Sequence, residues 1–396
     1  MENLHVVVVG AGVGGIAAAL LLARAGARVT LLEAAPESRT VGAGILLQPN
    51  GLAVLYGLDL DERLLRRGAR ITRLRVADAA GELILDVPVP RFADGLDHAL
   101  VLRRRELLAA LVDLVLAEPR VECRFDAEVL AASPGGEVTY RAPGGTRAVA
   151  ADLVVGADGV HSRIRKQGRF GARVHRSHRY VRGLGPPLPL DGLTEYWTDL
   201  GIFGVAPVDG GTYFYGSTEA APLRAALDER DVALFRATWA RTLPVAGEAL
   251  AAVARCEDLV PSQVIRVDCA RWSDGRLVLL GDAAHAMAPN LGQGAGSALG
   301  DATVLAWELA RPGDRAAALA RYEARRHHAV RTVQNLAEQL AWLSALTYPV
   351  VRGLRDQALR LLGPWLIGDV TMRLVEQQDP LWLRLAAANP AEIDGG

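Results

Sequence analysis

A glycine-rich turn near the N-terminus is the first segment whose residue types and spacing predict chemistry. Gly10, Gly12 and Gly15 match the pattern G-x-G-x-x-G, and an apolar run typical of a buried strand precedes them. Gly10 permits a tight turn, Gly12 allows the backbone to approach a pyrophosphate, and Gly15 allows the next helix to pack closely on the sheet. The N–H groups at the start of that helix, around Val13 and Gly14, would then face the phosphates.

An acidic residue accompanies this turn. Glu33 stands at the end of the second expected strand, where its carboxylate can accept hydrogen bonds from ribose hydroxyls. Because a carboxylate disfavours a 2′-phosphate, we expect the AMP-like half of FAD or NAD here, and not NADP. The glycine pattern alone is a weak signal. Its place between a strand and a helix, with the acid correctly spaced, favours a dinucleotide site over a turn without a ligand.

A second glycine-rich segment lies late in the chain. The motif G-D-A-A-H at 281–285 follows an expected buried strand, and P-N-L-G-Q-G-A-G at 289–296 opens a long helix. Asp282 can bind the hydroxyls of a sugar or polyol. The helix start presents unpaired N–H groups and partial positive charge, which would stabilise negative charge on the pyrimidine end of a reduced flavin. The alternative is a structural strand–turn–helix in which Asp282 caps the helix.

A third motif, Gly156-Ala157-Asp158-Gly159-x-x-Ser162-x-x-Arg165, lies between these two. In this order the three motifs resemble those of the class A flavin-dependent monooxygenases, the p-hydroxybenzoate hydroxylase-like family, and the resemblance covers roughly residues 1–330. It implies an enzyme in which NADH or NADPH reduces FAD. Dioxygen then forms a flavin hydroperoxide, which hydroxylates or epoxidises a small aromatic or polyene-like metabolite.

The resemblance also implies roles for individual residues. Arg104 would open a helix and contact the flavin, and Asp158 belongs to a motif linked to both FAD and NAD(P)H. Asp282 would bind the ribitol chain, and the loop with Gly44 would lie beside the isoalloxazine. The ADP part of FAD would be bound by Gly10, Gly12, Val13, Gly14, Gly15 and Glu33, and the flavin ring by Gly292, Gln293, Gly294 and Ala295.

The elements that must position these residues indicate an α/β protein. We expect a Rossmann-like FAD-binding domain with an inserted, mainly antiparallel β-sheet substrate domain and a helical C-terminal region. The FAD-binding domain would consist of three segments and the substrate domain of two. The expected ranges are 1–72, 98–172 and 268–330 for the FAD-binding domain, 73–97 and 173–267 for the substrate domain, and 331–396 for the C-terminal helices.

Aromatic residues of the substrate domain are candidates for a cavity over the flavin. Tyr213 and Tyr215 share one face of their strand by alternation. The alternative for each candidate is ordinary packing in the sheet. No activating base and no other catalytic residue can be assigned, and no spacing of His, Cys, Asp or Glu predicts a metal site. We expect His327 and His328 on the surface. The cavity candidates are Trp197, Phe203, Tyr213, Tyr215 and Pro289.

Composition restricts the partners. The formal net charge is −1, so no basic field attracts nucleic acid. The late apolar stretch 340–351 is too short to span a membrane, and three cysteines without C-x-x-C spacing fit a reducing cytoplasm. We therefore expect a cytoplasmic monomer or homodimer that acts on a small molecule and dioxygen. Three alternatives remain: a flavin-dependent reductase or dehydrogenase without oxygen transfer, an NAD-only dehydrogenase, and a flavin-free binding protein.

Overall fold

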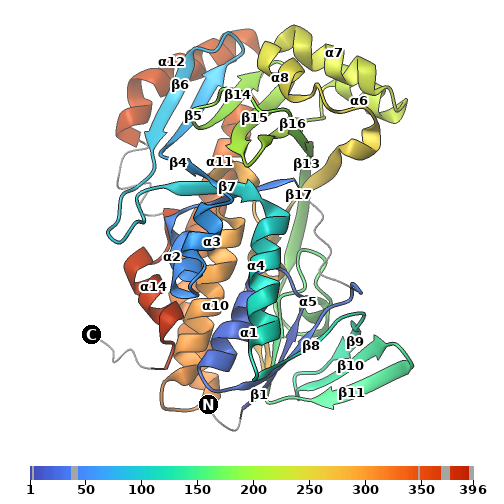
Figure 1. Ribbon diagram of the computed structural model, residues 1–396, viewed down its shortest axis with the longest axis vertical. Helices are drawn as coiled ribbons and strands as arrows, with labels where there is room; N and C mark the ends of the chain where they lie inside the picture. The colour runs from blue at the N-terminus through green and yellow to red at the C-terminus, as the bar shows by residue number, and fades with distance from the viewer. Residues whose placement is uncertain (2–3, 37–42, 347, 367–374, 392–396) are drawn as a thin grey trace.

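The computed structural model describes residues 1, 4–36, 43–346, 348–366 and 375–391. Figure 1 shows an elongated molecule with a parallel sheet and its helices at one end and a larger antiparallel sheet at the other. Helices α10 and α11 run between the two ends. This arrangement confirms the predicted α/β class with an antiparallel sheet and a helical C-terminal region.

The first sheet, called the parallel sheet below, carries the N-terminal glycine-rich turn. Its six strands lie in the order β18-β19-β12-β1-β2-β8, and all neighbours are parallel except β18 and β19. Strand β1 consists of one histidine and four valines, all buried, as expected for a central parallel strand covered on both faces. The bounds are β1 His5–Val9, β2 Arg28–Leu32, β8 Val121–Arg124, β12 Leu153–Gly156, β18 Ser273–Asp274 and β19 Leu277–Leu279.

Helices cover the parallel sheet. Helix α1 (Val13–Arg24) is buried over almost its whole length because α10 (Gly294–Ala310) packs against it. The remaining helices of this half and of its links with the other half are all short except α4. Their bounds are α2 Pro49–Gly57, α3 Asp61–Leu65, α4 Arg104–Ala117, α5 Arg163–Gln167 and α9 Asp282–His285, with a 3₁₀ turn η2 over Pro289–Leu291.

The second sheet, called the antiparallel sheet below, has the strand order β17-β13-β16-β15-β14-β5-β6. Its neighbours are antiparallel except β14 and β5, which are parallel. Strands β5 and β6 come from an early stretch of the chain and complete one edge of the sheet. The bounds are β5 Arg73–Asp78, β6 Leu83–Pro88, β13 Arg173–Gly185, β14 Leu193–Thr198, β15 Gly201–Val208, β16 Gly211–Ser217 and β17 Val260–Asp268.

Three helices cover one face of the antiparallel sheet, and the sequence analysis did not predict them. Leu223, Phe235 and Trp239 pack from these helices against sheet residues such as Phe203 and Phe214. Their larger apolar residues lie three to four positions apart, but the short length of the helices and their many alanines weaken that pattern. Their bounds are α6 Ala221–Asp228, α7 Val232–Thr242 and α8 Pro244–Ala249, with a 3₁₀ turn η1 over Cys256–Asp258.

Two small sheets complete the strands. One joins the two halves of the molecule in the order β3-β7-β4. The other contains the predicted hairpin around residues 143–145, which is confirmed as β10 paired with β11. The bounds are β3 Gly44–Leu47, β4 Ala69–Ile71, β7 Ala99–Arg103, β9 Glu128–Ala132, β10 Glu137–Ala142 and β11 Gly145–Ala150.

The C-terminal helices are α11 (Arg315–Ser344), α12 (Pro349–Leu366) and α14 (Pro380–Ala388). The expected division between residues 330 and 331 falls inside α11. Helix α12 packs on strand β6, and α14 packs on α2 (Figure 1). Trp382 of α14 meets Trp307 edge to face at 5.3 Å. In the described part of the chain, no helix is both long enough and apolar enough to cross a membrane.

The prediction that both histidines of α11 lie on the surface is correct for His328 and wrong for His327. His328 is exposed, but His327 Nε2 lies 3.0 Å from the carbonyl oxygen of Cys269, and its ring packs against Trp272 at 5.5 Å. The sequence pattern missed this contact because the neighbouring arginines and glutamates made the whole helix face resemble a solvated one.

A fully buried carboxylate ties the late glycine-rich segment to two helices. Asp301 of α10 is 0% exposed. Its oxygens accept hydrogen bonds from Arg326 Nε of α11 at 2.7 Å and from the Gly281 N–H at 2.9 Å, and His285 Nε2 lies 2.5 Å away. Burial alone would raise the pKa of Asp301, but His285 and Arg326 outweigh burial and lower it from 3.8 to about 2.

We expect Asp301→Asn to lower the free energy of unfolding by about 3 kcal/mol at neutral pH, because the amide leaves the buried guanidinium of Arg326 without a counter-charge. Urea denaturation measures this change. Because the folded-state pKa lies below the unfolded value of 3.8, the stabilisation is present above that pH and is lost as pH falls toward 2. The difference in the free energy of unfolding between wild type and variant should therefore disappear as the pH falls from 3.8 toward 2.

The matched control for this prediction is Asp314→Asn, since Asp314 is exposed and its side chain caps no helix N–H. We expect this variant to differ from wild type by less than about 0.5 kcal/mol. Equal stability of Asp301→Asn and wild type at neutral pH would contradict the assigned role.

Candidate functional site

One cavity of about 450 Å³ lies between the ends of the parallel strands and the inner face of the antiparallel sheet. Both glycine-rich segments line it. Strand β1 leads into the first segment, and β19 leads into the second. The lining residues from these segments are Gly12, Val13, Gly14, Gly15, Gly281, Asp282, Pro289, Asn290, Leu291, Gly292, Gly294 and Ala295.

Close packing of α1 on α10 brings the two segments together. A Cβ on Gly14 would lie 2.9 Å from the Cβ of Ala298, so a larger residue would push the helices apart. Gly15 packs so closely on the turn that a Cβ there would overlap the carbonyl oxygen of Gly10, which itself has a φ of +100°. This geometry explains why glycine is required at Gly10 and Gly15 of the pattern.

The starts of α1 and α10 form a cradle for an anionic, extended ligand. Within the described chain, neither helix has an acidic residue in its first turn, and no side chain caps either start. Their first N–H groups therefore keep the capacity to bind phosphate or another anion. No atom lies within 4 Å of the positions that a Cβ would occupy on Gly12 or Gly294. These donors and this open space fit FAD.

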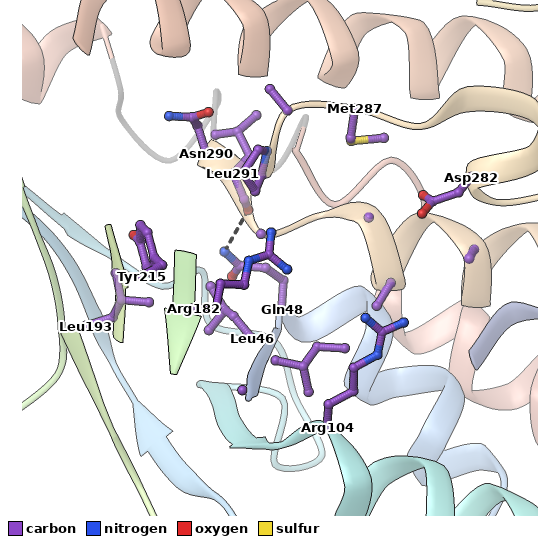
Figure 2. Close-up of a pocket in the computed structure, with 18 of the residues that line it drawn as sticks. Leu46, Gln48, Arg104, Arg182, Leu193, Tyr215, Asp282, Met287, Asn290 and Leu291 are labelled. Carbon is purple, nitrogen blue, oxygen red and sulfur yellow. Dashed lines mark hydrogen bonds between the residues drawn. The ribbon is translucent and has the colours of Figure 1, made fainter. Parts of the chain in front are cut away.

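Arg104 and Asp282 provide the charged groups of the cavity. Arg104 is the first residue of α4, as predicted, and Figure 2 shows its guanidinium and the carboxylate of Asp282 pointing into the same open space. Burial lowers the pKa of Arg104, and Asp282 partly opposes that shift. Gly44 also lines the cavity, and a Cβ there would lie 2.5 Å from the ring of Tyr213.

Four predicted cofactor residues do not line the cavity. Gly10 forms the turn behind it. Glu33 accepts hydrogen bonds from the N–H groups of Ala11 at 2.7 Å and Ala35 at 2.8 Å, so its carboxylate braces the glycine-rich turn. The other two are Asp158, which accepts hydrogen bonds from the Arg163 and Ile164 N–H groups at the start of α5, and Gln293, which accepts them from Asn50 and Gln377.

The correction for Gln293 has a simple cause. It precedes the first residue of α10, and its fully buried side chain points away from the cavity toward α2 and the segment after residue 375. Alternation of backbone direction in a glycine-rich loop cannot be read from residue type, so only the neighbouring Gly292, Gly294 and Ala295 line the cavity.

The inner face of the antiparallel sheet carries most of the aromatic candidates. Trp197, Tyr213 and Tyr215 line the cavity, and Pro289 does so from η2. Phe203 does not. It is paired with Tyr196 and not with Trp197, so its side chain points to the other face, where its ring lies 4.9 Å from Trp239. The strand register that decides this cannot be read from the sequence.

Several cavity residues were not predicted. Glu195 accepts hydrogen bonds from Trp197 Nε1 at 2.7 Å and from the Tyr215 hydroxyl at 2.8 Å. Arg182 and Gln48 also line the cavity, and Gln48 Nε2 donates to the carbonyl oxygen of Leu291 at 3.4 Å (Figure 2). Alternation was the signal for Glu195, since it stands two residues before Trp197 on one strand and therefore shares its face.

Because Gly204 has no side chain, Tyr215 can reach Glu195. Gly204 of β15 is paired with both Glu195 and Tyr215, and a Cβ on Gly204 would overlap the Tyr215 ring. The ring therefore lies across β15 and reaches the next strand.

Among the described residues, no group of three or more His, Cys, Asp or Glu side chains could hold a metal ion.

Known proteins resemble this chain along most of its length. A family model described as FAD binding domain matches residues 3–337. The chain is 31% identical over 338 residues to aurachin C monooxygenase/isomerase of Stigmatella aurantiaca, covering 81% of this chain and 85% of that protein. It is 32% identical over 363 residues to 3-amino-4-hydroxybenzoate 2-monooxygenase of Streptomyces cremeus, covering 86% and 87%.

A solved structure shows the same architecture with a ligand. A variant of Klebsiella pneumoniae HpxO complexed with FAD superimposes with a TM-score of 0.79 at 25% sequence identity, covering 94% of this chain and 99% of that chain.

We expect Asp282→Ala to weaken FAD binding about tenfold or more, because a hydroxyl of the ribitol chain of FAD would lose a charged hydrogen-bond acceptor. Titration of the flavin-free protein with FAD, followed by quenching of flavin fluorescence, measures the affinity. Asp228→Ala removes an exposed carboxylate at the end of α6 and should leave the affinity unchanged. Unchanged affinity in Asp282→Ala would refute its role.

We expect Gly204→Ala to displace the Tyr215 ring and break its hydrogen bond to Glu195, lowering the free energy of unfolding by about 1–3 kcal/mol. Urea denaturation reports the change, and FAD affinity should stay at the wild-type value. In the control Gly353→Ala, the new Cβ meets no atom within 4 Å, so that variant should be equally or more stable. Wild-type stability of Gly204→Ala would show that Tyr215 does not need this space.

Proposed function

Since this chain belongs to the FAD-binding family of flavin-dependent aromatic monooxygenases, we propose that it hydroxylates a small, largely apolar aromatic metabolite held against the antiparallel sheet. The chain is an FAD-dependent monooxygenase that uses NAD(P)H and dioxygen. The observation that carries the substrate proposal is that both helix starts and the aromatic sheet face line one cavity.

The residues of the cavity divide into two sets by what they would hold. The start of α1 would bind the pyrophosphate of FAD, Asp282 its ribitol hydroxyls, and the start of α10 the pyrimidine end of the ring. Arg104 lies between these groups and the sheet. When bound, FAD supplies the redox and oxygen chemistry, and this chain supplies binding, orientation and exclusion of water.

The sheet face limits the substrate. Apart from Glu195, Arg75, Arg182 and the aromatic residues, the side chains that the sheet presents to the cavity are apolar, and they favour a planar ring with few charges. Tyr213 lies over Gly44 and would close the side of the cavity next to the flavin. The apolar lining residues are Leu74, Val76, Leu85, Val87, Leu193 and Ile202.

Compartment and assembly belong to the same proposal. Cys123, Cys256 and Cys269 are all free, which fits a reducing compartment, and we infer a cytoplasmic enzyme. We also propose that the enzyme is a monomer or a homodimer.

We expect substrate-dependent oxidation of NADH or NADPH and one atom of labelled oxygen in the product when the holoenzyme turns over under ¹⁸O₂. A panel of phenols and nitrogen heterocycles, screened for faster flavin reduction, identifies a substrate, and mass spectrometry of its product counts the label. Turnover that yields an unlabelled product would instead identify a reductase or dehydrogenase.

A further inference from the structure

One row of residues across the antiparallel sheet brings polar side chains into the cavity. Arg182 on β13 is paired with Tyr215 on β16, Tyr215 with Gly204 on β15, and Gly204 with Glu195 on β14. Directly paired residues point to the same face of a sheet. The row therefore presents a guanidinium, a phenol and a carboxylate to the cavity, and all three side chains line it.

Glu195 differs from most buried acids of the described chain, because only it and Glu376 form no ion pair. It is only 9% exposed, and apolar residues such as Val76, Leu85 and Ile202 line the cavity around it. A buried carboxylate normally has a cationic partner. Within the described residues, Glu195 forms no ion pair, and its only hydrogen-bond partners are the neutral donors Trp197 and Tyr215.

The two donors leave Glu195 with accepting capacity. An ionised carboxylate has about four lone-pair sites, and here each oxygen accepts one hydrogen bond. Burial raises the pKa of Glu195, while the hydrogen bonds from Trp197 and Tyr215 oppose that shift. The guanidinium of Arg355, which lies 4.7 Å over the Trp197 ring, pairs with its own neighbour Asp356 at 2.7 Å.

We propose that Glu195 is the specificity-determining residue of the substrate cavity, and that its carboxylate accepts a hydrogen bond from a phenolic O–H or ring N–H of the substrate. This rests on the proposed function, which places the aromatic ring in this cavity. Trp197 and Tyr215 position the carboxylate through their hydrogen bonds, and Gly204 gives Tyr215 the space to do so. No covalent step is involved.

The proposal defines the substrate class by chemistry. A donor hydrogen-bonded to a carboxylate increases the electron density of the ring, which suits attack by an electrophilic oxygen. A substrate carboxylate placed at the same point would meet a like charge in an apolar surrounding and be disfavoured. The enzyme should therefore prefer neutral rings that carry an O–H or N–H donor.

Three naphthalene probes of nearly equal size test this preference in the holoenzyme without NAD(P)H. They are 2-naphthol, 2-methoxynaphthalene and 2-naphthoate, and isothermal titration calorimetry measures their affinities. We expect 2-naphthol to bind about tenfold more tightly than the methyl ether, as for a hydrogen bond to a charged group, and 2-naphthoate to bind most weakly. Failure of 2-naphthol to bind, or any other order, would overturn the proposal.

The variant Glu195→Gln should change the affinities for two of the probes in opposite directions. It should weaken 2-naphthol about tenfold and strengthen 2-naphthoate roughly fivefold, because the substitution removes both the charged acceptor and the repulsion. A residue with only a structural role would weaken all three probes together, and that outcome would overturn the assignment. The wild-type order of the three probes remains a test if the variant fails to fold.

The control is Glu219→Gln, two residues after the end of β16, where Glu219 pairs with Arg179 of β13 at 3.4 Å outside the cavity. It should bind all three probes as wild type does. Because binding is measured without turnover, the result is separate from the oxygen-label experiment. An unlabelled product would reject the monooxygenase proposal and leave the binding pattern intact, whereas a labelled product with the wrong binding order would reject only Glu195.

Discussion

The geometry of the site depends on the packing of α1 against α10, and one buried carboxylate fixes that arrangement from behind. Asp301 holds the Gly281 N–H, His285 and Arg326 at once, so the loop after β19, helix α10 and helix α11 share a single anchor. Gly14 allows α1 to approach from the other side. Two helix starts separated by most of the chain thereby meet over one cavity, which is the condition for gripping an extended dinucleotide.

The sequence of this half of the site identified the family, because its residues are constrained by backbone chemistry, although four of the predicted cofactor residues do not line the cavity. Glycines that permit close approach and an acid at a strand end leave a readable pattern, and the family that they indicated is confirmed. On the substrate side, Trp197, Tyr213, Tyr215 and Pro289 line the cavity and Phe203 does not. Phe203 shows what the sequence leaves open: the face to which a strand residue points depends on register, and register is set by pairing with distant strands. The helices α6 to α8 were missed because they are short and rich in alanine, which obscures the helical spacing of their larger apolar residues.

The two halves of the cavity differ in what binds and in how they bind. The side with the two helix starts presents backbone N–H groups and few side chains, whereas the sheet side presents side chains almost alone. Relatives that are named for different substrates match this chain along most of its length, as expected if the first half is shared and the second varies. Glu195 and Gly204 belong to the sheet half, where Glu195 places a carboxylate on a face that also carries apolar side chains, tyrosines and the guanidinium groups of Arg75 and Arg182.

Strands β5 and β6 have a consequence for how such enzymes can be re-engineered. They form one edge of the antiparallel sheet, yet they are encoded between β4 and β7, far from the strands that they join. Leu74, Val76, Leu85 and Val87 thus reach the cavity from a stretch that precedes α4. The substrate face therefore cannot be exchanged as one continuous stretch of sequence. Grafting residues 173–267 from a relative would import only part of the wall, so chimaeras need two exchanged stretches whose shared border, between β14 and β5, is kept matched.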